Sequence, residues 1–126
     1  MESLRSHTLM QKRIILVEDN PAIRASLLSA LSDLTIGEVV ATAETVDEAL
    51  KVSTECDWQL MVLDLFLREG NGLSVLEALQ QRAANQQIFM LTNYVSPDVC
   101  RRCAALGADA VFDKSTQLDE FFTAIN

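Results

Sequence analysis

The feature that most constrains the fold is a nearly uninterrupted apolar run over residues 58–67, with a single carboxylate at Asp64. Such a run is typical of a strand that is buried on both faces, as in a parallel sheet covered by helices. Because an isolated buried charge is costly, we expect the strand to end near Asp64 and its carboxylate to enter a polar site. Gly70 and Gly72 follow soon afterwards and support an end of the strand at this point.

Short apolar runs and helical patterns alternate along the rest of the chain. We predict further strands over residues 14–17, 38–43, 87–91 and 110–112, and helices over 21–34, 45–54, from 72, 96–107 and from 115 or 116 to 125. The strands are too apolar to leave one face of the sheet in water. The pattern therefore predicts a parallel sheet covered on both sides, with right-handed crossovers.

Three helix starts have recognisable caps. Asn20 precedes Pro21, which is the typical order of a capping residue and the first helical residue. Thr45 and Glu48 have the spacing of a capping box, in which each side chain accepts from the other's amide. For the last helix we expect Ser115 or Thr116 to be the cap.

The bulk properties limit the class of protein. The 126 residues suit about one domain, and we assign residues 13–126 to it, after an N-terminal tail over residues 1–12. The net charge of −8 argues against direct binding of nucleic acid, which needs a basic surface. No apolar stretch is long enough to span a membrane, and the first residues lack the apolar segment of a secretory signal. We therefore expect a cytoplasmic protein.

The three cysteines are interpreted as reduced thiols. Cys100 and Cys103 have CxxC spacing, which places them one turn apart on one face of a predicted helix. The one histidine, His7, lies in the predicted tail, so a zinc site would lack ligands. A packing role is the simpler interpretation.

Polar residues stand where the predicted strands end. Glu18 and Asp19 follow the first strand, Asp64 the central one, Thr92 the next, and Lys114 follows the last. In open α/β sheets the functional crevice lies at the carboxyl ends of the strands. If these strands are neighbours, three carboxylates, a hydroxyl and an ammonium group share one pocket.

The chemistry of this set indicates phosphoryl transfer. Three close carboxylates repel one another unless they take up protons or bind a cation, and oxygen-only ligands in an incomplete cage favour Mg²⁺. A metal beside Lys114 makes a positive niche for a phosphoryl group next to Asp64. An aspartate carboxylate can act as the nucleophile that forms a covalent phosphoenzyme. Positioning and charge neutralisation would then drive the transfer.

With these residues in this order, the chain resembles a response-regulator receiver domain over nearly its whole length, from about residue 13 to 125. The resemblance implies a flavodoxin-like (βα)5 fold, a doubly wound five-stranded parallel sheet with strand order 2-1-3-4-5. It also implies a two-component signalling module that takes its phosphoryl group from the phosphohistidine of a histidine kinase.

The resemblance implies a role for each strand-end residue. Glu18 and Asp19 would be the acidic pair that holds Mg²⁺ together with Asp64, and Asp64 would be the phosphoacceptor. Thr92 would be the switch hydroxyl and Lys114 the phosphate-binding lysine.

The resemblance also implies a further ligand and a set of partners. The backbone carbonyl of Phe66 would complete the protein's share of the metal shell. The partners would be a histidine kinase or phosphotransfer protein and an unidentified downstream protein, without direct nucleic-acid or membrane contact. Receivers commonly form homodimers, so a homodimer is compatible with the resemblance, while the sequence leaves the oligomeric state undetermined. The module would be a regulatory phosphoacceptor that assists its own phosphotransfer and autodephosphorylation, rather than an enzyme with a separate substrate.

Two positions depart from the family pattern. Val111 stands where receivers usually carry the Tyr or Phe that responds to the switch threonine, and strand alternation points Phe112 to the other face of the sheet. Ser115 stands where many receivers have a cis-proline, so the preceding peptide bond should be trans. Phe66 and Tyr94, two residues after Asp64 and Thr92, should flank the path of attacking water and slow hydrolysis of the phosphoaspartate.

Other classes of protein remain as alternatives. A pseudo-receiver would keep the fold as an interaction scaffold without phosphorylation, which Val111 favours and the complete acidic set disfavours. A phosphatase or mutase with an aspartyl nucleophile would typically need a cap domain or a second acid. A flavin-binding flavodoxin would need a hydroxyl-rich phosphate loop after the first strand, where this chain has Glu18, Asp19 and Asn20.

Overall fold

In the computed structural model, which describes residues 11–126, five strands alternate with five helices along the described chain. The elements are β1 (Arg13–Val17), α2 (Pro21–Leu34), β2 (Glu38–Ala43), α3 (Val46–Glu55), β3 (Leu60–Leu63), α4 (Gly72–Ala78), β4 (Gln87–Thr92), α5 (Pro97–Ala105), β5 (Ala110–Asp113) and α6 (Leu118–Ile125). All neighbouring strands are parallel, in the order β2-β1-β3-β4-β5. The predicted fold is thus confirmed. Most of the predicted tail lies outside the described residues.

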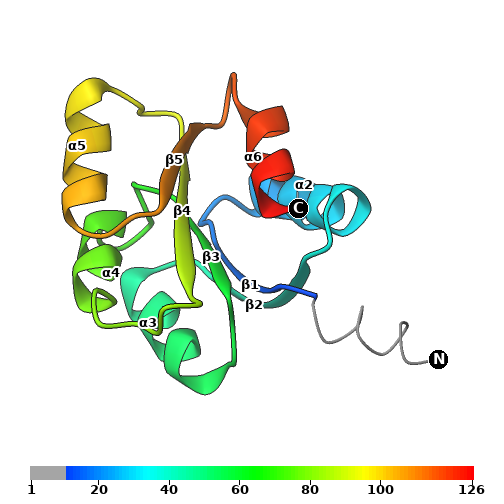
Figure 1. The fold of residues 1–126 in the computed structure, drawn as a ribbon, viewed down its shortest axis with the longest axis horizontal. Coiled ribbons are helices and arrows are strands. Elements are labelled where there is room, and N and C mark those ends of the chain that lie inside the picture. Colours follow the sequence, from blue (N-terminus) through cyan, green and yellow to red (C-terminus); the bar gives the residue numbers. More distant parts are fainter. Residues whose placement is uncertain (1–10) are drawn as a thin grey trace.

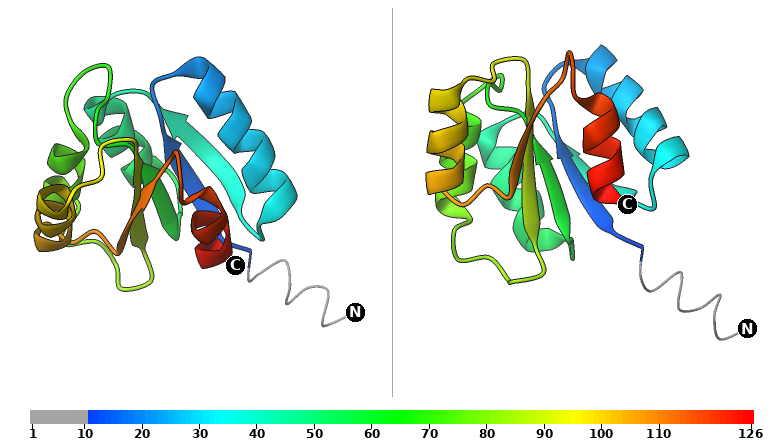
Figure 2. Two further views of the ribbon diagram at one scale, coloured as in Figure 1. Left: turned by 90° about the horizontal axis from the view of Figure 1, so that it is seen from above. Right: turned by 45° about the horizontal axis from the view of Figure 1, so that its top comes forward.

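Helices cover both faces of the sheet. Helices α3, α4 and α5 lie on one side and α2 and α6 on the other, as Figures 1 and 2 show from three directions. Because side chains alternate along a strand, β1 sends Ile15 and Val17 into the core beneath α3–α5, and Ile14 and Leu16 into the core beneath α2 and α6. Strand β3 is buried at every position, which explains the continuous apolar run in its sequence.

Two of the predicted caps form. The side chain of Asn20 accepts hydrogen bonds from the amides of Ala22 and Ile23 at 2.9 and 3.0 Å, directly before Pro21. Thr45 Oγ1 accepts from the amide of Glu48 at 3.1 Å. The return bond of the capping box differs from expectation, because Glu48 Oε1 accepts from the Glu44 amide at 2.8 Å rather than from that of Thr45.

The predicted cap of the last helix is wrong. Helix α6 begins at Leu118, and its N-cap residue Gln117 makes no side-chain capping bond. A turn delays the helix, since the Gln117 amide donates to the Asp113 carbonyl at 2.8 Å and Gln117 Oε1 accepts from the Asp113 amide at 2.9 Å. The Ser115 hydroxyl is instead directed to Asn93 Oδ1 at 3.0 Å. The peptide bond before Ser115 is trans, as predicted, since residues 11–126 contain no cis peptide.

The two residues in the middle of β5 face opposite cores, as predicted. Phe112 stacks edge-on between Phe89 and Phe121, with ring centroids 5.6 Å apart in both pairs, in the core beneath α2 and α6. Val111 packs against the core beneath α3–α5. The aromatic side chain of β5 is therefore held on the face opposite to Val111.

Cys103 is fully buried in the core beneath α3–α5, which supports a packing role. Burial raises the pKa of its thiol, with a further rise from nearby Cys100 and a smaller opposing effect of Arg102. The thiolate, which is the reactive form, is therefore disfavoured. Of the helices in residues 11–126, none has the length and apolarity to cross a bilayer.

We predict that Phe121→Ala destabilises the domain by about 3–5 kcal/mol, because it removes a fully buried ring from the stack with Phe112. Urea unfolding followed by the fluorescence of Trp58, which is also buried, measures the loss. The control is Leu34→Ala, at a residue that is 55% exposed, which should change stability by less than about 0.5 kcal/mol. Equal effects of the two substitutions would contradict the assignment of the core.

Candidate functional site

The carboxyl ends of the strands bring the predicted acidic residues together. Glu18, Asp19 and Asp64 each offer a carboxylate oxygen, and these atoms lie within 4.8 Å of one another. The strand pairing continues just beyond the strands, since the Asp64 amide donates to the Val17 carbonyl at 3.3 Å. The Lys114 amide likewise donates to the Thr92 carbonyl at 3.0 Å, which fixes the end of β5 against β4.

The loop after Asp64 depends on a close approach of α4. A Cβ atom on Gly72 would lie 2.4 Å from the carbonyl oxygen of Asp64, so a larger residue could not occupy this position without a shift of the backbone. The Gly72 amide donates to the Leu65 carbonyl at 2.7 Å and holds the two segments together. The glycine that marked the end of the strand in the sequence thus also lets α4 start close to the backbone of Asp64.

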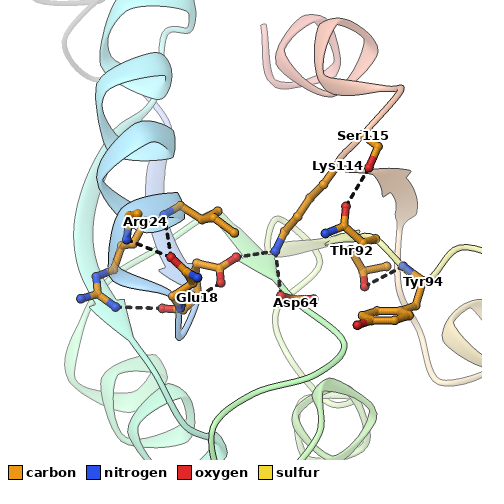
Figure 3. Close-up of polar contacts among 11 residues, drawn as sticks. Glu18, Arg24, Asp64, Thr92, Tyr94, Lys114 and Ser115 are labelled. Atoms are coloured by element: carbon orange, nitrogen blue, oxygen red, sulfur yellow. Dashed lines mark hydrogen bonds and ion pairs between the residues drawn. The ribbon is translucent and has the colours of Figure 1, made fainter.

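Lys114 lies between two of the acids, as Figure 3 shows. Its Nζ donates to Glu18 Oε1 at 2.6 Å and to Asp64 Oδ2 at 2.8 Å. Burial by itself lowers the pKa of Lys114, but the hydrogen bonds to Asp64 and Glu18 and the attraction of their charges outweigh it and leave this pKa raised. The ammonium group is therefore firmly charged at neutral pH and partly neutralises the acidic cluster.

Glu18 is 2% exposed and both of its carboxylate oxygens have partners. Oε1 accepts from Lys114, and Oε2 accepts from the backbone amide of Asn20 at 3.1 Å. Asn20, predicted only as a helix cap, thus also orients an acid of the site. A buried carboxylate with donors on both oxygens keeps a fixed orientation.

The sequence reasoning missed Arg24. Its guanidinium donates to the Glu18 carbonyl at 3.0 Å (Figure 3). The guanidinium also pairs with the carboxylate of Glu44 at 3.2 Å. Glu44 also pairs with Arg68, from the loop after β3, at 3.1 Å. These contacts join α2, the loop after β2 and the loop after β3 at the rim of the site. The positions are distant in sequence, and no local motif marks them.

Thr92 is fully buried at the end of β4, and its Oγ1 accepts a hydrogen bond from the Tyr94 amide at 3.3 Å (Figure 3). Phe66 and Tyr94 are the predicted flanking residues, and they are in contact. Their ring centroids are 4.7 Å apart with the ring planes at 86°. The role of the Phe66 carbonyl as a metal ligand stays a prediction.

The acidic cluster fits a hard divalent cation. Three carboxylate oxygens converge from β1 and β3, whereas a single ammonium compensates two of those carboxylates by direct hydrogen bonds. Oxygen ligands of this kind suit Mg²⁺, which completes its shell with water. Glu18, Asp19 and Asp64 are therefore the candidate ligands.

A groove of about 370 Å³ opens beside Lys114, between α2 and α6. Its walls are mainly apolar and include Ala22, Ile23, Leu27 and Leu118, with Asn93 and Lys114 at the end near the site. Of the groove's lining residues, Lys114 is the one that contacts the acidic cluster, through Glu18 and Asp64.

The fold and the cluster together define a doubly wound α/β domain with an acidic site at the carboxyl edge of its sheet. The sequence profile of the response regulator receiver domain matches residues 14–126. The chain therefore belongs to the response regulator receiver domain family of two-component systems, a regulatory family whose members generally bind Mg²⁺.

Known proteins of similar sequence are regulatory proteins. The response regulator protein VraR of Staphylococcus saprophyticus is 24% identical over 116 residues, which cover 92% of this chain and 56% of that protein. The photosynthetic apparatus regulatory protein RegA of Cereibacter sphaeroides is 28% identical over 114 residues, which cover 90% of this chain and 61% of that protein. The chain thus spans less than two thirds of the length of these relatives.

Solved structures of similar fold are also response regulators. A two-component response regulator of the LuxR family from Aurantimonas sp. SI85-9A1 has a TM-score of 0.84 at 25% identity, over 91% of this chain and 82% of that one. A DNA-binding response regulator of the LuxR family from Staphylococcus aureus has a TM-score of 0.83 at 21% identity, over 91% of this chain and 96% of that one. These likenesses support the same fold.

We predict that Lys114→Met lowers stability at pH 7 by about 3 kcal/mol, because Glu18 and Asp64 lose the cation between them. Since the pKa of Lys114 is raised in the folded state, this stabilisation is complete below the ordinary lysine pKa of about 10.4 and is lost as the pH rises through the higher folded value. Urea unfolding at several pH values measures both effects.

The matched control is Lys51→Met, which removes an exposed lysine on α3 and should have little effect. Mg²⁺ should restore much of the stability that Lys114→Met loses, because a divalent cation can neutralise the same carboxylates. An equal response of the two variants to Mg²⁺ would contradict the assignment of the metal site.

Proposed function

We propose that this domain accepts a phosphoryl group on Asp64, in the presence of Mg²⁺, from the phosphohistidine of a histidine kinase or phosphotransfer protein. Phosphorylation then changes the binding of a downstream protein. The observation that carries the proposal is the position of Lys114 Nζ, 2.8 Å from Asp64 Oδ2 and beside a cluster of three carboxylates. A cation already in contact with the Asp64 carboxylate is placed to neutralise the charge that transfer brings.

In the proposed transfer, an Asp64 oxygen attacks phosphorus, the phosphorus–nitrogen bond breaks, and the donor imidazole leaves. Bound Mg²⁺ would supply charge neutralisation at the phosphoryl oxygens. Glu18 and Asp19 would hold the metal with Asp64 and the Phe66 carbonyl. Lys114 would exchange a carboxylate partner for a phosphoryl oxygen, and the Thr92 hydroxyl would donate to another oxygen.

The groove beside Lys114 supports a protein as the phosphodonor. Its apolar wall from α2 and α6 would receive apolar side chains of the donor, while its polar end lies next to Lys114. A donor seated there would present its phosphohistidine to Asp64 from the open side of the site.

Several further features of the module remain part of the proposal. Residues 13–126 act as one receiver domain, without direct contact to nucleic acid or membrane, and they can pair with a second copy of the chain. The three free cysteines suit a reducing cytoplasmic compartment. The domain acts as a regulatory phosphoacceptor that assists its own phosphotransfer and autodephosphorylation.

The rival interpretation, a scaffold that is never phosphorylated, has no support beyond Val111. The five predicted site residues stand at adjoining strand ends, and Lys114 directly contacts two of the acids. A scaffold would have no need of this convergence of charge.

We predict that wild-type protein incubated with acetyl phosphate and Mg²⁺ gains the mass of one phosphoryl group, whereas Asp64→Asn does not, because the amide lacks the nucleophilic oxygen. Intact-protein mass spectrometry measures the adduct. The control Asp33→Asn removes an exposed carboxylate at the far end of α2 and should be phosphorylated normally. An adduct on Asp64→Asn, or none on the wild type, would contradict the proposal.

We also predict that Phe66→Asn speeds the loss of the phosphoryl group. The Phe66 ring is packed against Tyr94 beside the site, and the smaller polar side chain would admit and orient a water molecule. Decay of the adduct after removal of the phosphodonor gives the rate for each protein. An unchanged rate in the variant would show that the ring does not restrict water.

A further inference from the structure

The route by which a signal leaves Asp64 cannot use the aromatic side chain of β5. Val111 occupies the position on the α3–α5 side, and it packs into that core as an aliphatic side chain. Phe112 is fixed on the opposite face by its contacts with Phe89 and Phe121. Turning Phe112 toward Thr92 would require β5 to shift its register by one residue.

Another pair of aromatic residues lies directly beside Thr92. The Tyr94 amide donates to Thr92 Oγ1 at 3.3 Å, and the Tyr94 ring stands edge-to-face on the Phe66 ring. Tyr94 is 60% exposed and Phe66 is 50% exposed, so the core does not fix either ring. At 3.3 Å the hydrogen bond is slightly longer than the usual range for an amide donor and is readily exchanged for another.

The pair also connects to α4. Phe66 forms an isolated antiparallel bridge with Asn71, which is the N-cap of α4. The side chain of Asn71 accepts from the Leu73 amide at 2.7 Å. A displacement of Phe66 therefore acts on the residue that sets the first turn of α4.

A small pocket marks the surface that such a displacement would change. It has a volume of about 210 Å³ and lies between the start of α4 and α5, with Phe66 in its wall. The other lining residues are Leu65, Asn71, Leu73, Val99 and Arg102.

We propose that Tyr94 and Phe66 couple the orientation of Thr92 to the start of α4, in place of an aromatic side chain on β5. The inference rests on the proposed phosphorylation of Asp64. When the Thr92 hydroxyl turns to donate to the phosphoryl group, its oxygen leaves the Tyr94 amide. Tyr94 then moves, its contact with Phe66 changes, and the bridge from Phe66 to Asn71 carries the change to α4. In the unphosphorylated protein the same contacts hold Thr92 in its present orientation.

The chain contains one tyrosine, so replacing tyrosine by 3-fluorotyrosine labels Tyr94 alone. We expect its fluorine resonance to shift when acetyl phosphate and Mg²⁺ are added, in proportion to the phosphoryl adduct measured by mass spectrometry. In Thr92→Val, which keeps the shape and removes the hydroxyl, the shift per adduct should be lost. Thr92→Ser, which keeps the hydroxyl, should restore it.

A second measurement follows α4 through the amide resonance of Leu73. It uses variants that retain all polar side chains of the site. In Phe66→Leu the response of this resonance per adduct should be lost, whereas the control Phe112→Leu should respond as the wild type does. A full response in Thr92→Val or Phe66→Leu, or its loss in Phe112→Leu, overturns the coupling while the phosphoryl adduct still supports the proposed function. Absence of the adduct from the wild type overturns the phosphorylation and, with it, the coupling.

Discussion

The ion pairs of Lys114 with Asp64 and Glu18 are the interaction on which the rest of the site depends. They join the ends of β5, β3 and β1. The ammonium group of Lys114 thereby contacts Asp64, which lies 50 positions earlier in the sequence, and Glu18, which lies 96 positions earlier. Both acids are almost fully buried, and without a cation between them their charges would repel at short range. The parallel sheet makes the contact possible, because its strands end at one edge.

The same arrangement leaves the cluster incomplete. One ammonium group compensates two carboxylates by direct contact, while Asp19 adds a third within 4.8 Å. This excess of negative charge favours a divalent cation, and in the proposed function a bound cation would free Lys114 to meet an incoming anion. The local charge balance would thus link stability and metal binding to the proposed phosphoryl acceptance.

The distribution of aromatic residues separates the stacked core from the pair to which we assign the proposed coupling. Phe89, Phe112 and Phe121 stack in the core beneath α2 and α6, where a ring cannot turn without loss of packing. Phe66 and Tyr94 pair at the surface beside Thr92, where little else restrains them. Mobile coupling elements come from the weakly packed parts of a structure, which fits the exposed pair better than the stacked one.

The sequence by itself determined the alternation of strands and helices, the doubly wound sheet, the family, and the strand-end residues from Glu18 to Lys114. Hydrophobic periodicity and strand ends are local signals, and parallel pairing converts them into a shared site. The sequence did not reveal the start of α6, because the Gln117 amide, which a Ser115 cap would have served, donates instead to the Asp113 carbonyl in a turn. Only the tertiary structure decided that Arg24 supports Glu18, and that Tyr94 contacts both Thr92 and Phe66. Contacts between loops depend on how the strand ends are spaced and turned, which no local pattern encodes.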